Sequence, residues 1–412
     1  MQAVSGDAAA LDISRGGDPG LGRWLNGFPP EIFGDRLYQS IELMERYSIA
    51  LSARVLDELG IREQLGEWHT SQQLCAHLSF QPRFAAALSW LLERVLGSDS
   101  IEVKRDGENP MYRARGTGCK IDLAELRSIA LQIDSGNAAT LDLLDHAAAN
   151  YATIARGEDT AEGCMFGPNG IALWLTYFHN KNLTYSVNNW VGAVVAAERL
   201  ASRPRIRILE VGAGAGSAST TLLEWFDRQD LLPRIEHYVA TEPNAFFRRR
   251  AQREVTARYP TVPLTWSSLN VNDPWSAQIA DRGDFDLVYA VNVLHVSKNL
   301  LFSLKEAASA LAPNGWLVLG ECIRPHDNQP IYPELMFQNL DSFTDVLVDP
   351  EIRPRAGFLT AEQWRRAFGR AGLGHVEVAP DIDSIQTIYS HFFTAAICGQ
   401  QSGANDSTDG RG

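Results

Sequence analysis

Hydrophobic and polar positions alternate with different periodicities in the two halves of the chain. Between Leu37 and Ile61, apolar residues recur every three or four positions, which predicts one amphipathic helix or two helices in series. Two more helical stretches follow, and residues 101–115 then show two short strand-like runs on either side of a turn that contains Gly107. Helices followed by a hairpin are typical of a winged-helix module.

The helical pattern continues up to Pro204 and then changes. Beyond it, short apolar runs alternate with helical stretches, which predicts a mostly parallel α/β sheet. We therefore expect a helical and winged-helix lid domain over residues 34–200 and an α/β domain over residues 201–400. Residues 1–33 and 401–412 show no sustained periodicity and are predicted to be a flexible arm and a flexible tail.

The charge of the chain limits its partners. With a formal net charge of -13, the chain lacks the basic surface that nucleic-acid binding normally requires. Residues 31–115, which include the predicted winged helix, hold 13 acidic and 10 basic residues, so DNA binding is disfavoured there as well. We interpret this module as a packing or dimerisation element, which allows a homodimer, and expect a small molecule or a protein as the partner.

Cysteines and apolar runs indicate the compartment. The five cysteines are far apart and form no C-x-x-C pair, so the sequence predicts neither a disulfide framework nor a metal site. There is no run of about 18 apolar residues and no signal-like N-terminus, which disfavours both membrane spanning and export. These features fit a cytoplasmic protein.

The strongest chemical signal is residues 208–217, where an apolar strand that carries Glu210 runs into three glycines. Gly212, Gly214 and Gly216 allow sharp turns and the close approach of a ligand. Their G-x-G-x-G spacing differs from the G-x-G-x-x-G of dinucleotide-binding loops. A carboxylate at Glu210 attracts the cationic amino group of a methionine moiety, and this favours S-adenosylmethionine (SAM) over a dinucleotide.

Polar residues also follow the next three predicted strands. Glu242 ends the second strand, where a carboxylate can accept hydrogen bonds from both hydroxyls of a ribose. Asn270 and Val271 follow the third strand and are expected beside the adenine, and Asn292 follows the fourth. Ligands of open α/β sheets bind beyond the carboxyl ends of the strands. We therefore predict that these residues bind SAM.

These motifs resemble those of class I SAM-dependent methyltransferases, and among them the carbon-methyltransferase domains of polyketide synthases. The segments ILEVGAGAGS, FDLVYAVNVLHVSKNL and LAPNGWLVLGE are similar to the family's glycine loop, N-V-L-H segment and final parallel strand. Upstream similarity to the family's lid extends the resemblance over residues 38–398. The resemblance implies a Rossmann-like seven-stranded sheet, a natural-product acceptor of polyketide type, and pocket-lining roles for Tyr177 and Tyr185. At Asn270 the family usually has an acid.

Transfer of a methyl group to carbon or oxygen needs a base that removes the proton of the acceptor. His295 follows the fourth strand, and histidine is the side chain that titrates closest to neutral pH. Glu321 ends the fifth strand, from which a carboxylate can orient the imidazole or stabilise its protonated form. The resemblance implies the same roles, since the related carbon methyltransferases are understood to use a His and a Glu at the matched positions.

Two other interpretations stay open at this point. The segment GECIRP resembles small-molecule O-methyltransferases of the plant type, although Val296 and Ser297 stand where those enzymes usually have Asp-Trp. A non-catalytic SAM-binding or winged-helix regulator would share the fold. We favour an enzyme that methylates carbon, ahead of oxygen and then of sulfur or nitrogen. Its acceptor is a small molecule, either free, which we slightly favour, or bound to a carrier protein.

Overall fold

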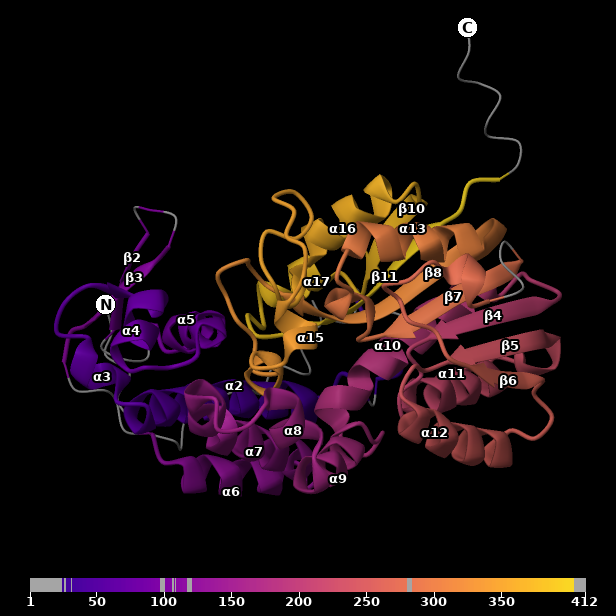
Figure 1. The fold of residues 1–412 in the computed structure, drawn as a ribbon. Helices are drawn as coiled ribbons and strands as arrows, with labels where there is room; N and C mark the ends of the chain where they lie inside the picture. The colour runs from indigo at the N-terminus through magenta and orange to yellow at the C-terminus, as the bar shows by residue number, and fades with distance from the viewer. Residues whose placement is uncertain are drawn as a thin grey trace, which may run out of the picture.

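The computed structural model describes residues 24–403 with the exception of residues 26, 31, 97–100, 106, 108, 117–120 and 280–283. Most of the predicted arm and tail, and part of the predicted hairpin turn, lie outside the described residues. Figure 1 shows a group of N-terminal helices beside a sheet that carries helices on its faces.

The N-terminal part of the chain is helical and contains one small sheet. Its elements are α2 (Asp35–Glu58), α3 (Ile61–Gln64), β1 (His69–Thr70), α4 (Ser71–His77), the 3₁₀ helix η1 (Pro82–Phe84), α5 (Ala85–Arg94), β2 (Ile101–Lys104) and β3 (Met111–Ala114). The strands form an antiparallel sheet in the order β1-β3-β2. Thr70 begins α4 with a capping box that it forms with Gln73. These helices followed by a hairpin have the order expected for a winged helix. The use of this module for dimerisation remains a prediction.

Five further helices connect this part to the sheet. They are α6 (Leu123–Ile133), α7 (Asn137–Arg156), α8 (Ala161–Phe166), α9 (Pro168–Tyr177) and α10 (Leu183–Leu200). Helix α7 ends at Gly157, whose left-handed conformation closes the last turn. Helix α10 is buried along most of its length, because it runs from the N-terminal helices onto the sheet (Figure 1).

The remainder of the chain alternates strands with helices. Its elements are β4 (Ile206–Val211), α11 (Ser217–Arg228), η2 (Leu232–Arg234), β5 (Ile235–Thr241), α12 (Ala245–Arg258), β6 (Leu264–Ser267), η3 (Trp275–Ala277), β7 (Phe285–Val291), η4 (Leu294–Val296), α13 (Leu300–Ala310), β8 (Leu311–Arg324), α14 (Glu334–Phe337), α15 (Asp341–Thr344), β9 (Leu359–Thr360), α16 (Ala361–Arg370), β10 (Gly374–Ala379), α17 (Ile382–Gln386) and β11 (Thr394–Gln400).

The central sheet has the strand order β10-β11-β8-β7-β4-β5-β6, and the short β9 pairs with the end of β8. Strands β4 to β8 are parallel to one another, whereas β11 runs antiparallel to both of its neighbours, β8 and β10. Helices α10 to α12 cover one face and α13 and α16 the other (Figure 1), which is why the apolar run of β7 is almost entirely buried. The predicted Rossmann-like α/β fold with a helical N-terminal region is confirmed.

Buried polar contacts tie the N-terminal helices to the segment that follows β8. Glu45 of α2 pairs with Arg94 of α5, and its Oε1 accepts a hydrogen bond from the backbone N–H of Tyr332 at 3.0 Å. Nε1 of Trp90 donates to Glu334 at 2.6 Å. Glu45 and Glu334 are almost completely buried, so each needs these partners. The segment after β8 is thereby held between the N-terminal helices and the carboxyl ends of the strands.

Candidate functional site

The loop between β4 and α11 turns at its three predicted glycines. Gly212, Gly214 and Gly216 have φ angles of 69°, 54° and 87°, in the left-handed region. A Cβ atom would lie 2.6 Å from Val293 at Gly212 and 2.8 Å from Val255 at Gly216, so these two glycines also permit close packing. A Cβ atom at Gly214 would meet nothing within 4 Å. Gly214 therefore gives a ligand direct access to the backbone.

Glu242 directly follows β5 and holds the glycine loop. Its carboxylate accepts hydrogen bonds from the backbone N–H groups of Gly214 at 3.0 Å and Asn244 at 2.8 Å. Burial raises the pKa of Glu242, and the two N–H donors and Arg248 oppose that rise. Each carboxylate oxygen retains capacity for a further hydrogen bond. The carboxylate can therefore bind the loop and a ligand hydroxyl at the same time.

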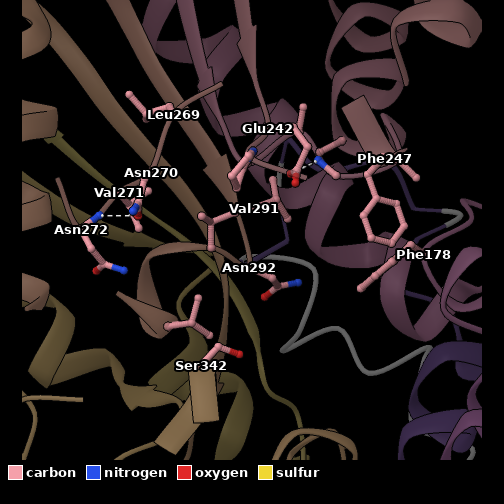
Figure 2. A pocket seen from close by; sticks show the side chains of 18 of the residues that line it. Phe178, Glu242, Phe247, Leu269, Asn270, Val271, Asn272, Val291, Asn292 and Ser342 are labelled. Atoms are coloured by element: carbon pink, nitrogen blue, oxygen red, sulfur yellow. Dashed lines mark hydrogen bonds between the residues drawn. The ribbon is translucent and has the colours of Figure 1, made fainter. Parts of the chain in front are cut away.

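A cavity of about 600 Å³ lies between the N-terminal helices and the carboxyl ends of the strands. Figure 2 shows Phe178 and Phe247 on one side of it, and Leu269 to Asn272 on the other. Seven of the predicted site residues line it, namely Gly212, Gly214, Glu242, Asn270, Val271, Asn292 and the lid residue Tyr185. Five do not, namely Glu210, Gly216, Tyr177, His295 and Glu321.

Two asparagines in the cavity wall use their side chains to shape the backbone. The Oδ1 of Asn270 accepts a hydrogen bond from the N–H of Asn272 at 3.1 Å (Figure 2), and its Nδ2 donates to Asp273 at 2.7 Å. Asn292 has a φ of 54°, and its Oδ1 accepts a hydrogen bond from the N–H of Cys322 at 3.1 Å. Asparagine tolerates this left-handed conformation better than most residues. Each oxygen keeps one lone pair for a ligand.

Glu210 lies behind the glycine loop. Its Oε2 accepts hydrogen bonds from the hydroxyls of Ser219 at 2.6 Å and Tyr238 at 2.8 Å, and its Oε1 has no hydrogen-bond partner among the described residues. Burial raises the pKa of Glu210 to about 7, and the two hydroxyl donors oppose that rise. A buried acceptor without a partner is rare in native proteins. A cationic group of a ligand, reached directly or through a water, would satisfy it.

The structure brings His295 and Glu321 together from two elements. His295 lies in the 3₁₀ helix η4, just after β7, and Glu321 lies in β8, beyond the end of its pairing with β7. Nδ1 of His295 is 2.8 Å from Oε2 of Glu321, and the side chains are 4% and 0% exposed. A carboxylate at this distance fixes the proton on Nδ1 and leaves Nε2 as the basic nitrogen. Nε2 forms no hydrogen bond within the described part of the chain.

Residues that the sequence did not identify surround the imidazole. The ring centroids of Phe358 and Phe343 lie 4.5 Å and 5.9 Å from that of His295. Phe337 stacks on Phe343 at 5.4 Å. Arg353 donates a hydrogen bond to the carbonyl oxygen of His295. All four belong to the segment between β8 and β9, and no spacing within that segment marks them, because their shared neighbour comes from elsewhere in the chain.

The N-terminal helices contact the end of the glycine loop through Tyr185. Its hydroxyl lies 3.0 Å from the hydroxyl of Ser217 at the start of α11. Asn180 also donates to the carbonyl oxygen of Ser217 at 3.0 Å. Tyr177 packs against Tyr185 with ring centroids 5.4 Å apart, one layer away from the cavity. Burial raises the pKa of Tyr185 to about 12 and that of Tyr177 well above its usual value, so both hydroxyls stay protonated.

The remaining lining residues of the cavity were not predicted either. Phe166, Phe178 and Phe247 provide aromatic surface, and Lys298 pairs with Asp345 at 2.9 Å across the other side. The aromatic residues come from the lid and from α12, where a helical pattern gives no sign of which side chains face a ligand.

The cavity has the properties that SAM requires. Its volume lies in the range of small-molecule sites, and it combines exposed backbone at Gly214, a carboxylate at Glu242 and apolar surface at Val271 and Phe247. The unpaired oxygen of Glu210 lies behind the same loop. Among the described residues there is no group of three or more His, Cys, Asp or Glu side chains that could hold a metal ion. No helix in this part of the chain is long and apolar enough to cross a membrane.

Comparison with known sequences identifies the domain. Residues 209–317 match the sequence model of the family described as "Methyltransferase domain". The chain is 29% identical over 249 residues to Polyketide synthase PksR of Bacillus subtilis, and this match covers 59% of the chain but 9% of the synthase. It is 28% identical over 320 residues to Fumosorinone synthetase of Cordyceps fumosorosea, which covers 76% of the chain and 7% of that protein. The chain thus spans less than a tenth of either relative.

Solved structures show the same fold. The CurJ carbon methyltransferase aligns with a TM-score of 0.74 at 22% identity, over 95% of this chain and 98% of that one. The DszA carbon methyltransferase aligns with a TM-score of 0.70 at 23% identity, over 88% and 91% of the two chains. The chain therefore contains a methyltransferase domain of the SAM-dependent class and has the fold of the carbon methyltransferases.

Proposed function

We propose that the protein transfers the methyl group of SAM to an acidic carbon of a small natural-product acceptor of polyketide type, with His295 as the general base. The observation that carries the proposal is the buried pair of His295 and Glu321 beside a cavity that suits SAM. One of the relatives named above, PksR, is a polyketide synthase, and the structural neighbours are carbon methyltransferases. Both support this choice of acceptor.

The cofactor would lie along the carboxyl ends of β4 to β7. Glu242 would accept hydrogen bonds from the ribose hydroxyls, and Asn270 and Val271 would contact the adenine. Gly212 and Gly214 would leave room for the methionine part, whose amino group the free oxygen of Glu210 would attract. When bound, SAM supplies a methyl group already activated by its sulfonium.

The chain's own task is then to make the acceptor nucleophilic. Nε2 of His295 would take a proton from the acceptor carbon and leave that carbon nucleophilic toward the methyl group of SAM, whose bond to sulfur would break to release the neutral thioether S-adenosylhomocysteine. Glu321 keeps the other ring proton on Nδ1 and stabilises the imidazolium that forms. Phe343 and Phe358 shield the ring from water, which strengthens this electrostatic interaction. A thioether sulfur carries no proton, so a buried base favours carbon, or an oxygen acid, over sulfur.

The position of the new methyl group tests the proposal directly. Candidate acceptors are incubated with SAM that carries a ¹³C-labelled methyl group, and NMR of the product locates the label. We expect a carbon-bound methyl group at a position between two carbonyl groups. A label on oxygen would still require a base but would show that carbon is not the acceptor atom. A label on sulfur would contradict both the carbon acceptor and the need for a base.

The same assay distinguishes two ways of delivering the acceptor. The net charge of -13 disfavours an acidic carrier protein, so we expect turnover of the free acceptor. One acceptor is compared in its free and pantetheine-bound forms. Turnover of the bound form alone would show that a carrier is required.

A further inference from the structure

Arg353 is a buried cation without a carboxylate. It lies between α15 and β9, where its backbone forms a two-way bridge with Asp349, and its side chain is completely buried. Burial lowers the pKa of Arg353 to about 10, and no ion pair of this side chain occurs among the described residues. Desolvation of a charged group costs several kcal/mol, so its other contacts must compensate for it.

The guanidinium donates hydrogen bonds to the turn that carries His295. Nη2 donates to the carbonyl oxygen of His295 and Nη1 to that of Ser297, each at 2.7 Å. The 3₁₀ helix η4 is one turn long, and the last carbonyl groups of so short a helix have no partner within it. Arg353 supplies both missing donors from a single planar group.

A lysine could not replace this contact. The two carbonyl groups belong to residues two positions apart, and the rigid fork of a guanidinium spans them with two parallel donors. A lysine ammonium would keep the charge but would reach only one of them well. The identity of residue 353 therefore controls how firmly the backbone of His295 is held.

The ring of His295 is fixed at Nδ1 by Glu321, and its backbone is fixed at the carbonyl oxygen by Arg353. We propose that Arg353 is a positioning residue, which holds η4 so that Nε2 of His295 points at the proton of the acceptor. The inference rests on the proposed function in one respect, namely that His295 acts as the base. It assigns no contact between Arg353 and the substrate.

The kinetic test uses Arg353→Lys, with Arg199→Lys as a control at an arginine that pairs with Glu377 of β10, away from the segment between β8 and β9. We expect Arg353→Lys to lower kcat by roughly 10- to 100-fold with an unchanged KM for SAM, because a shift of about 1 Å at a catalytic group has an effect of this size. Arg199→Lys should leave kcat nearly intact. Guanidinium ion should restore part of the kcat of Arg353→Ala but none of that of His295→Ala. A folded Arg353→Lys with wild-type kcat would overturn the inference.

A second measurement does not depend on catalysis. In protein labelled with ¹⁵N-histidine, the ring signals of His295 are assigned by their loss in His295→Gln. We expect Arg353→Lys to broaden or shift these signals and Arg199→Lys to leave them in place. If His295→Ala were fully active, the proposed function would fail, and the ring signals would still decide the role of Arg353. Unchanged signals in Arg353→Lys would refute that role.

Discussion

On the glycine-loop side the cavity exposes backbone, whereas on the His295 side a cluster of buried side chains lies behind the residues that line the cavity. Gly214 and Glu242 meet through an N–H to carboxylate bond, and both lie within one strand-turn-helix unit and its neighbour. His295 instead depends on Glu321, Phe358 and Arg353, which arrive from β8 and from the segment after it. The first side is determined by local turns, and the second by long-range packing.

Cofactor binding and proton transfer would make different physical demands on these two regions. A backbone cradle can bind a cofactor with little reorganisation, because its N–H groups are fixed by the loop itself. A buried acid-base pair needs an environment that excludes water and holds two side chains at one distance. Changes on the two sides should therefore have different consequences for binding, turnover and stability.

The largest effect is expected on the glycine-loop side. Gly214→Arg places a long side chain into the cavity at a φ of 54°, so the affinity for SAM should fall below detection in calorimetric titration. Gly372→Arg is the control, because Gly372 also has a positive φ of 89° and open space but lies away from the cavity. It should bind SAM like the wild type. Equal binding by both variants would contradict the assigned loop.

The next effect concerns Glu334, which joins the segment after β8 to the N-terminal helices. Glu334 is fully buried and accepts hydrogen bonds from Trp90 and from Nε of Arg324, each at 2.6 Å. Glu334→Gln leaves the arginine charge unpaired, so the free energy of unfolding should fall by about 3 to 5 kcal/mol in urea titrations. The exposed pair of Glu362 and Arg366 is the comparison, and Glu362→Gln should cost less than about 1 kcal/mol. Equal losses in the free energy of unfolding would show that the buried pair of Glu334 and Arg324 stabilises the protein no more than an exposed pair does.

A smaller effect is expected within the acid-base pair. Glu321→Gln keeps the size of the side chain but removes the charge that stabilises the imidazolium. Turnover should fall by roughly 10- to 100-fold, the size expected for a hydrogen bond to a charged group. Steady-state kinetics with saturating SAM measure it. A loss as large as that of His295→Ala would mean that Glu321 itself takes the proton.

The smallest effect is a pH dependence of stability at a contact between α2 and the loop before β11. Nδ1 of His391 lies 2.7 Å from Glu42, and the hydrogen bond to Glu42 raises the pKa of His391. The stabilisation is therefore complete below the unfolded-state pKa of about 6.5 and is lost as the pH rises through the folded-state pKa. Because the pair is partly exposed, it contributes at most about 1 kcal/mol.

Urea unfolding of wild type and His391→Gln at several pH values measures this contribution. The difference between the two proteins should be largest near pH 5.5 and should vanish at high pH. A difference that does not change with pH would show that the two side chains merely pack together.

The sequence allowed most of the fold to be predicted, because the strands are apolar runs separated by helical stretches. It also indicated Glu242 and Gly214 as candidate cofactor contacts, from their place at the end of a strand and in a turn. The same reasoning from strand ends indicated His295, which follows a strand, and Glu321, which ends one. Their meeting in one buried pair depends on the neighbouring positions of β7 and β8 in the sheet.

The surroundings of that pair could not be predicted. Phe358 and Arg353 belong to no motif, and they contact His295 because the segment between β8 and β9 folds back over η4. Glu210 shows the opposite problem, since its position in the sequence suggested a direct ligand contact. In the structure its carboxylate is buried, its Oε2 accepts hydrogen bonds from Ser219 and Tyr238, and Glu210 does not line the cavity.

Turnover by His295→Ala tests the central claim, that His295 is the general base, most directly. With an identified acceptor, the variant should lose roughly 10²- to 10⁴-fold in kcat, the usual contribution of such a base, and should keep the affinity of the wild type for SAM. Replacement of the exposed His375 by Ala should change neither quantity. If His295→Ala retains nearly full turnover, base catalysis by His295 is wrong, and a mechanism that only positions the acceptor becomes the better account.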